Sequence, residues 1–329
     1  MTVLITGGSG FVGLNVASAL LARSEKVVLF GPAAPPDAAG RHLHSLPGRL
    51  AVVQGDVRDR TAIMAALRAH SADRIIHMAA ITAGLERESR EALLIAEVNL
   101  GGTIQVLEAA IACGVRRVIQ LGTGSVFGQV PAEVESIDET LPPVPDSLYG
   151  ITKYAAERTA MRYRETRGLN VVVGRLGVVF GRWEYDTGVR DTLSMPLQLL
   201  RLASGGGTAR FRGGLPDDWV YAADIAGAVM ALLDASAPRH GIYHLATGRR
   251  WSILDWCKRL QSAFPGFTYE VTQDLSKVTV GAAAPTARPP FRVDRLREDI
   301  GFTARFGEAE AFQDYLSWYQ EAAGSPAMR

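Results

Sequence analysis

Two side chains four residues apart, Tyr149 and Lys153, have the chemistry of an acid/base pair for alcohol oxidation. They lie in a stretch that predicts a helix, and residues at this spacing share one helical face. A secondary alcohol must lose a proton as hydride leaves its carbon, but a free phenol has a pKa near 10 and is a poor base at neutral pH. An ammonium about 4 Å away is worth roughly 4 kcal/mol at an effective dielectric constant near 20. We therefore expect Lys153 to lower the pKa of the phenol.

A strand end upstream of this pair supplies candidate hydroxyl groups. Thr123 and Ser125 follow the apolar run Arg117–Leu121. Hydroxyls at the carboxyl edge of a parallel sheet can reach a substrate carbonyl. Both residues qualify by chemistry, and a turn or cap role is a common alternative for either.

A glycine-rich turn occupies residues 6–13, between the first apolar run and the first amphipathic stretch. Its glycines stand at Gly7, Gly10 and Gly13. The first allows a tight turn, the second lets backbone approach a pyrophosphate, and the third lets helix and strand pack closely. The N–H groups at the start of the helix then face the anion. In this strand–turn–helix context the motif predicts a dinucleotide site.

The second strand leaves the choice between NAD and NADP open. A dinucleotide fold often ends this strand with an acid that holds the adenosine ribose. Here the strand ends Val28-Leu29-Phe30-Gly31, the nearest acid is Asp37, and Arg41 lies farther downstream. We favour NAD because no base is obviously placed for a 2′-phosphate.

The elements that must position these groups follow from an alternation of short β-branched runs and longer amphipathic stretches. The predicted strands are Thr2–Thr6, Val27–Phe30, Leu50–Val53, Arg74–Met78, Arg117–Leu121 and Val171–Leu176. The predicted helices between them are Val12–Arg23, Arg60–Ala69, Arg90–Cys113 and Leu148–Arg167. Continuous apolar strands that alternate with helices predict an α/β fold with a doubly wound parallel sheet, the Rossmann arrangement.

After Leu176 the pattern loosens and indicates a smaller substrate-binding lobe over the carboxyl edge of the sheet. We expect a dinucleotide-binding domain of residues 1–176 plus about 218–247, and a lobe of about 177–217 plus 248–329. The predicted features of this part are a helix at Ala222–Ala235, a strand at Ile242–Leu245, a linker at Gly281–Pro290, a helix at Glu308–Ala323 and a frayed tail at Gly324–Arg329.

Composition excludes several classes of protein. The 329 residues carry 35 Lys+Arg against 34 Asp+Glu, so no strong field attracts nucleic acid or an anionic membrane. The two cysteines, Cys113 and Cys257, have no metal-type spacing, so we expect no metal site and a reducing, cytoplasmic location. The N-terminus shows no signal-peptide pattern and no apolar run is long enough for a membrane helix.

The order of motifs resembles the extended short-chain dehydrogenase/reductases, the NAD-dependent epimerase/dehydratase family. Besides the glycine turn and the Tyr149–Lys153 pair, the matching segments are Gly55-Asp56-Val57, His77-Met78-Ala79-Ala80, residues 97–103, residues 121–128, Arg175-Leu176 with Phe180-Gly181, and Asp218-Trp219-Val220-Tyr221 with Asp224. Together they span about residues 2–250. The spacing is specific for the family, and much less so for one member.

The resemblance implies a role for each matching residue. The implied catalytic residues are Tyr149, Lys153, Thr123 and Asn99. The implied cofactor-binding residues are Gly7, Ser9, Gly10, Phe11, Val12, Gly13, Asp56, Val57, Met78, Ala79 and Ala80, with Asn99, Tyr149 and Lys153. The implied substrate-side residues are Thr82, Thr123, Ser125 and Val126, whereas His77 is expected to be structural. The resemblance also implies a homodimer through the helices Arg90–Cys113 and Leu148–Arg167.

Two departures from the family pattern bear on the substrate. Nucleotide-sugar members usually carry Asn where Val178 stands here (or Gly177, under a one-residue shift), and Arg where Asp217 stands. An acid facing a diphosphate would repel it. The segment 182–190 offers Arg182 and Arg190 for a substrate carboxylate, although solvated loop charges are an equally good interpretation.

Three functional hypotheses follow. The first is an NAD(P)-dependent oxidoreductase that moves hydride between nicotinamide and a secondary alcohol or ketone of a small sugar or sugar acid. The second is a nucleotide-sugar epimerase or dehydratase with tightly bound NAD, although Gly124-Ser125 offer no acid for an elimination. The third, a dinucleotide sensor without catalysis, has no need for Tyr149 and Lys153 in register.

Overall fold

Seven parallel strands form one sheet in the computed structural model, which describes residues 1–212, 218–281 and 288–322. In spatial order the strands are β10 (Ile242–Leu245), β6 (Val171–Leu176), β5 (Arg117–Thr123), β4 (Arg74–His77), β1 (Thr2–Thr6), β2 (Lys26–Gly31) and β3 (Arg49–Gln54). The strand order reverses between β1 and β4, the kind of place where ligands bind in such sheets. The prediction of a doubly wound parallel sheet is confirmed, and Ile242–Leu245 does join it, beside β6.

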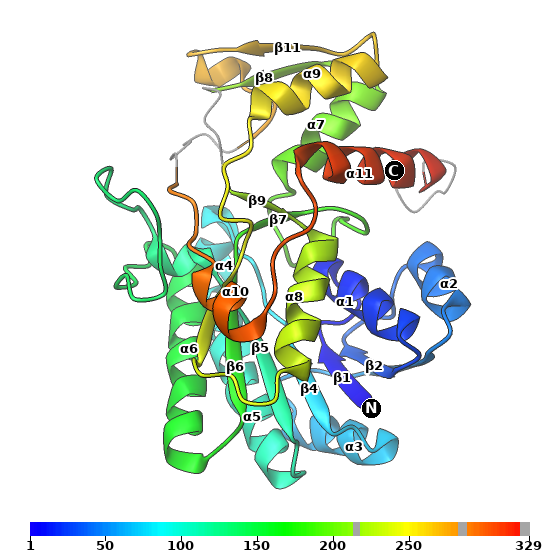
Figure 1. Cartoon of the computed structure of the whole chain (residues 1–329), viewed down its shortest axis with the longest axis vertical. Coiled ribbons are helices and arrows are strands. Elements are labelled where there is room, and N and C mark those ends of the chain that lie inside the picture. The colour runs from blue at the N-terminus through cyan, green and yellow to red at the C-terminus, as the bar shows by residue number, and fades with distance from the viewer. Residues whose placement is uncertain (213–217, 282–287, 323–329) are drawn as a thin grey trace.

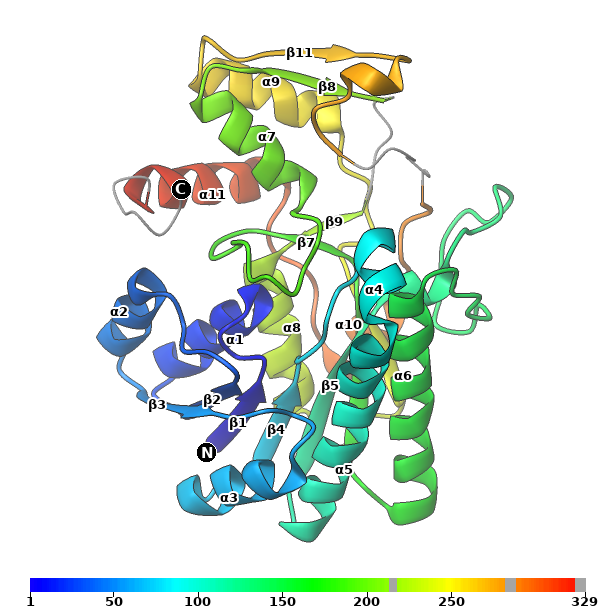
Figure 2. The ribbon, with the colours of Figure 1, turned by 180° about the vertical axis from the view of Figure 1, so that it is seen from behind.

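Helices cover both faces of the sheet, as Figures 1 and 2 show. The helices α1 (Phe11–Ala22) and α8 (Ala222–Asp234) pack on one face, with α2 (Asp37–Ser45) and α10 (Asp294–Ile300) beside them. The other face carries α3 (Arg60–His70), α5 (Gly102–Ala112) and α6 (Leu148–Arg167). Every residue of β5 is buried between these layers. Such full burial explains the nearly continuous apolar sequence of the central strands.

The start of α6 is set by local chemistry. The Ser147 side chain accepts a hydrogen bond from the Gly150 backbone N–H and caps the helix. Gly168, with φ of +64°, ends the helix in the left-handed conformation that glycine adopts without strain. The cap places Tyr149 in the first turn of α6, at the carboxyl edge of the sheet.

The long helix predicted at Arg90–Cys113 is three successive elements. They are α4 (Leu85–Ala96), which is kinked at Glu91, the π-helix η1 (Glu97–Gly101), and α5. π-Helical turns are rare and occur often at functional sites. By length and composition alone the run Leu85–Ala112 could cross a membrane, and 44% of its most apolar window is buried within the fold.

A smaller lobe lies above the carboxyl edge of the sheet (Figure 1). Its elements are α7 (Met195–Ser204), β8 (Thr208–Phe211), α9 (Ile253–Ala263), β11 (Thr268–Val271), the 3₁₀ turn Leu275–Lys277 and α11 (Glu308–Ala322), with the strand pair β7 (Val178–Phe180) and β9 (Trp219–Tyr221) leading into it. Its core is strongly aromatic and is centred on Phe180 and Trp256. The domain boundaries stay a prediction. Asp217, the tail and most of the linker lie outside the described residues.

Candidate active site

The glycine turn between β1 and α1 has the shape of an anion cradle. Gly7 has φ of +68°, and a Cβ added there would lie 2.8 Å from the backbone nitrogen of Ala79. A Cβ on Gly13 would lie 2.6 Å from the Gly7 carbonyl oxygen. Gly10 is the N-cap of α1 and supplies no side-chain cap, so the first N–H groups of the helix are open to a ligand. The residues present therefore fit a dinucleotide pyrophosphate.

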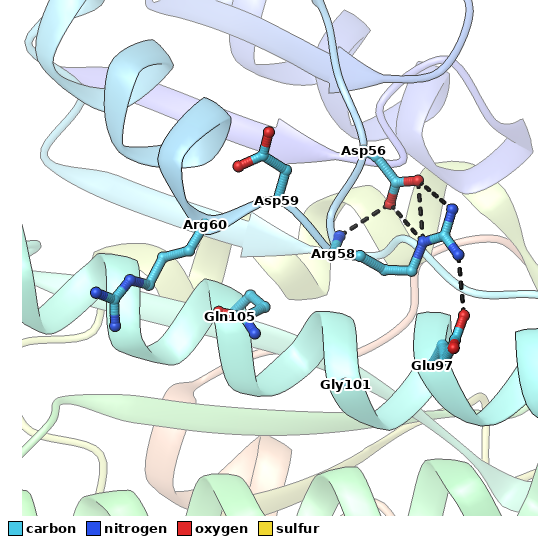
Figure 3. A pocket seen from close by; sticks show the side chains of 7 residues that line it. All are labelled: Asp56, Arg58, Asp59, Arg60, Glu97, Gly101 and Gln105. Atoms are coloured by element: carbon cyan, nitrogen blue, oxygen red, sulfur yellow. Dashed lines mark hydrogen bonds and ion pairs between the residues drawn. The ribbon is translucent and has the colours of Figure 1, made fainter.

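The segment after β3 carries an exposed charge network at the expected adenine end (Figure 3). The Asp56 carboxylate accepts hydrogen bonds from the Arg58 backbone N–H, Nε and Nη2, and Arg58 Nη1 lies 3.0 Å from Glu97 on η1. Arg58 lowers the pKa of Asp56. Val57 is buried against Gly102 of α5, so its contribution to a cofactor site is limited to its backbone. Sequence reasoning missed Arg58, although it directly follows the Gly55-Asp56-Val57 motif.

No acidic residue stands at the end of β2, where dinucleotide-binding folds often carry one. Pro32 follows Gly31, Asp37 begins α2, and Arg41 is exposed on that helix. Ser9 of the glycine turn donates its hydroxyl to the Ala33 carbonyl, 2.9 Å away, and so ties this loop to the cradle. The expected cofactor-wall residues Met78, Ala79 and Ala80 come directly after β4, with Ala79 against Gly7.

Tyr149 meets two threonine hydroxyls at the carboxyl edge of the sheet. Thr123, the last residue of β5, and Thr82, from the loop after β4, both hydrogen-bond the phenol. The pKa of Tyr149 lies above its ordinary value, because burial raises it by more than these two hydroxyls and the Arg190 charge lower it. Three segments that are far apart in the sequence thus converge on one phenolic oxygen.

The Lys153 ammonium binds the backbone of β5 and is not among the groups that shift the pKa of the phenol. Its Nζ donates to the Leu121 carbonyl oxygen at 2.7 Å, and the side chain is almost fully buried. Burial lowers the pKa of Lys153 to about 8, against the opposing charge of Glu157. Shared helical spacing places both side chains on one face of α6, but the lysine turns to β5, and the charge that lowers the pKa of Tyr149 belongs to Arg190.

Asn99 holds the site together from the interior. Its amide accepts from the Ile81 N–H at 2.8 Å and donates to the Ile81 carbonyl at 3.0 Å and to the Thr152 hydroxyl at 3.1 Å. Asn99 therefore positions the loop that carries Thr82. His77, buried in β4, has both ring nitrogens hydrogen-bonded, to Thr6 and Thr103, and burial lowers its pKa to about 3, as befits a neutral structural histidine.

The predicted substrate residues after β5 separate into two kinds. Ser125 is half-buried, and its hydroxyl accepts from the Thr123 hydroxyl at 3.2 Å. Val126 is fully buried in an apolar cluster with Phe127 and Phe291. A substrate contact through the Val126 side chain is therefore wrong, because that side chain points into the core.

Residues 182–191, which we call the strap, cross over the glycine turn. The Tyr185 hydroxyl donates to the Ser9 carbonyl at 2.7 Å, and the Asn15 amide of α1 donates to the Arg182 carbonyl at 2.8 Å. Both contacts join residues more than 150 positions apart in the sequence, which is why motif reasoning could not find Tyr185 or Asn15.

The two arginines of the strap have protein partners. Arg182 forms a bidentate ion pair with Asp314 of α11, so the expected substrate carboxylate would have to displace an existing one. Arg190 lies beside Thr82, and its Nη1 is 3.0 Å from Glu184. Within the described part of the chain, no group of three His, Cys, Asp or Glu side chains is arranged to hold a metal ion.

A parallel sheet with an open glycine turn and a tyrosine at its carboxyl edge defines a dinucleotide-binding α/β enzyme. The chain belongs to the NAD dependent epimerase/dehydratase family, whose sequence model matches residues 3–246. This confirms the resemblance and the assignment as an enzyme, and NAD is the cofactor that structurally similar proteins contain.

Similar proteins differ in the substrates that their names print. The chain is 31% identical to the sterol demethylase protein B of Methylococcus capsulatus, over 98% of this chain and 99% of that protein. It is 25% identical to a dTDP-glucose 4,6-dehydratase of Streptomyces niveus, over 98% and 93%. The solved UDP-glucose 4-epimerase of Thermus thermophilus in complex with NAD is 28% identical, with a TM-score of 0.78 over 98% of this chain and 100% of that one.

Proposed function

We propose that this protein is an NAD-dependent oxidoreductase that interconverts a secondary alcohol and a ketone, with Tyr149 as the acid/base. The observation that carries the proposal is the meeting of the Tyr149 phenol with the hydroxyls of Thr123 and Thr82 at the carboxyl edge of the sheet. When bound, NAD supplies the hydride acceptor or donor.

The residues of this chain account for the proton. In the oxidation direction the substrate hydroxyl hydrogen-bonds Thr123 and Tyr149, and the Tyr149 phenolate takes its proton. In the reverse direction the phenol gives that proton back. Lys153 and Arg190 are the cations of the site, and Asn99 holds the Thr82 loop in place.

For the substrate we infer a small sugar or sugar-acid-like molecule that lacks a nucleotide. Val178 stands where nucleotide-sugar members usually carry Asn. The similarity to a protein named for sterol demethylation supports a family member whose substrate has no nucleotide. An elimination is disfavoured because a Cβ on Gly124 would lie 2.4 Å from the Phe291 ring, so the position after Thr123 has no room for an acidic side chain.

A nucleotide-sugar epimerase with retained NAD is the second candidate. The strap favours it, because Tyr185 and Asn15 hold residues 182–191 over the cradle and would slow cofactor exchange. It is also supported by the similarity to UDP-glucose 4-epimerase. We further propose a homodimer through the α4–α5 run and α6, in the cytoplasm, with a small molecule as partner.

A substrate screen with NAD and with NADP separates these candidates. Net oxidation changes the absorbance of free cofactor with every turnover, whereas an epimerase leaves it constant while the product changes. Tyr149→Phe is the matched variant: cofactor affinity should stay within about twofold, and turnover should fall by about 10²–10⁴. Unchanged turnover in Tyr149→Phe would overturn the proposed function.

A further inference from the structure

Backbone pairing of the strap directs the Arg190 side chain toward the catalytic phenol of Tyr149. The strap pairs with the loop after β4 as a parallel β-bridge between Thr82 and Arg190. Its hydrogen bonds are Thr82 N–H to the Val189 carbonyl, 2.8 Å, and Asp191 N–H to the Thr82 carbonyl, 3.2 Å. Residues paired in this way project toward the same face. Since the Thr82 hydroxyl reaches Tyr149, the Arg190 side chain leaves the backbone toward Tyr149 as well.

The guanidinium of Arg190 is held from two sides. Its Nη1 lies 3.0 Å from Glu184 Oε1, and its central carbon lies 5.5 Å from the centre of the Phe11 ring. Phe11 is the first residue of α1, directly above the glycine turn. Arg190 therefore sits between the cofactor cradle and the phenol.

Glu184 is a buried carboxylate with a defined set of partners. Its side chain has 0% exposure, and it accepts from the Ser194 N–H at 2.6 Å and from the Ser194 hydroxyl. A buried carboxylate is costly unless it is paired and hydrogen-bonded. Burial raises the pKa of Glu184, and the Arg190 charge and the Ser194 hydrogen bonds oppose that rise. The ionised form of Glu184 therefore gains from a charged Arg190 that stays in place.

In the part of the chain that the structure describes, charged groups on α6 and α4 near Tyr149 have partners of their own. On its own helix, Lys153 donates to the Leu121 carbonyl. From α4, Glu88 accepts from the Leu148 N–H at 2.9 Å, and Arg87 lies 2.7 Å from Asp191 of the strap. Arg190 is the cation that lowers the pKa of the phenol.

We propose that Arg190, held by Glu184, is a positioning residue for catalysis whose positive charge stabilises the phenolate of Tyr149 during proton transfer. The inference rests on the proposed function. It adds to Lys153 a second cation, which belongs to the strap rather than to α6. Because the strap also covers the glycine turn, the same segment that lies over the cofactor site carries the charge that tunes the acid/base.

The test is a spectroscopic titration of Tyr149 in the full-length protein. The phenolate absorbance of Tyr149 is isolated by subtracting the curve of the corresponding Tyr149→Phe protein, since the chain has 9 tyrosines. We compare the parent with Arg190→Gln and Arg190→Lys. The double variant Arg190→Gln with Glu184→Gln leaves no unpaired buried charge, which keeps the test valid if Arg190→Gln alone fails to fold. Asp314→Asn is the matched control, because it breaks the ion pair of the strap with Arg182 and leaves Arg190 in place.

We expect loss of the Arg190 charge in Arg190→Gln to raise the Tyr149 midpoint by about one pH unit, the scale of one charge several ångströms away at an effective dielectric constant near 20. The double variant also removes the opposing charge of Glu184, so its midpoint should rise by less but stay above that of the parent. Arg190→Lys and Asp314→Asn should stay within about 0.3 pH unit of the parent. The proposal is overturned if the double variant titrates Tyr149 with the midpoint of the parent, or if Asp314→Asn raises the Tyr149 midpoint as much as the loss of Arg190 does. Neither outcome depends on turnover, so the failure of the proposed function, seen in Tyr149→Phe kinetics, is a separate result.

Discussion

Arg175 of β6 and Glu157 of α6 form a bidentate ion pair in the interior, with Nε–Oε2 and Nη2–Oε1 distances of 2.7 and 2.6 Å. Their side chains are 2% and 1% exposed. Glu157 lies one helical turn after Lys153, and its charge opposes the lowering of the pKa of Lys153. The pair therefore connects the strand beside β5 to the helix that carries both Tyr149 and Lys153.

Glu157→Gln should destabilise the fold strongly. Removing one partner of a buried ion pair leaves the other charge without compensation, which costs about 3–5 kcal/mol. Urea unfolding monitored by circular dichroism measures the change. The double variant Glu157→Leu with Arg175→Met removes both charges and should recover most of the loss. A double variant as unstable as Glu157→Gln would contradict this explanation.

The gain in unfolding free energy that Lys153→Met gives relative to the parent should shrink as the pH rises. Lys153 has a folded-state pKa of about 8, below its ordinary value of 10.5. Below pH 8 the folded parent buries a charged lysine, which lowers its stability. Between about pH 8 and 10.5 Lys153 is neutral in the folded chain but still protonated in the unfolded chain, so the unfolding free energy of the parent rises with pH. The unfolding free energy of Lys153→Met relative to the parent should therefore drop by up to roughly 3 kcal/mol across this range. A constant difference would show that Lys153 is not buried with a lowered pKa.

Thr123→Ala should reduce turnover much more than Ser125→Ala. The Thr123 hydroxyl contacts the phenol and also caps the turn after β5 by accepting from the Ser125 N–H at 3.1 Å. The Ser125 hydroxyl has only the Thr123 hydroxyl as its partner among the described residues. We expect a loss of about 10²-fold or more for Thr123→Ala and less than about tenfold for Ser125→Ala, with partial recovery in Thr123→Ser. Steady-state kinetics decides, and the reverse order would identify Ser125 as the catalytic hydroxyl.

Gly13→Ala and Gly40→Ala form a matched pair, since both glycines lie within helices. The methyl group on Gly13 would overlap the Gly7 carbonyl, whereas the nearest atom to a Cβ on Gly40 is a Pro35 side-chain carbon 3.9 Å away. We expect Gly13→Ala to abolish the rise in melting temperature that NADH produces. Gly40→Ala should keep this rise and add up to about 1 kcal/mol of stability, because alanine is the better helix former. An intact NADH response in Gly13→Ala would mean that the turn is not the cofactor cradle.

Local sequence patterns predicted the bounds of those helices and strands whose pattern lies within a single segment. Thr2–Thr6, Val171–Leu176, Leu148–Arg167 and Ile242–Leu245 agree with the structure at both ends. The burial of nearly every residue in these strands and the capping of α6 both depend on adjacent residues. In the lobe, α9 had a usable signal that sequence analysis passed over: Ile253, Trp256, Cys257 and Leu260 are buried at helical spacing behind a Ser252 cap. The short strands β8 and β11 had no such signal, because they pair with each other outside the main sheet and neither is a continuous buried run.

The chain itself determined the alternation that builds a parallel sheet, the glycine turn, and the register of Tyr149 with Lys153, because each of these depends on neighbours within a few residues. Folding in three dimensions decided which cation faces the phenol. Helical spacing puts Lys153 near Tyr149, but the lysine is drawn to the Leu121 carbonyl of β5, and Arg190 arrives from the strap. Contacts between such distant segments depend on how the lobe packs over the sheet, and no local pattern encodes that packing.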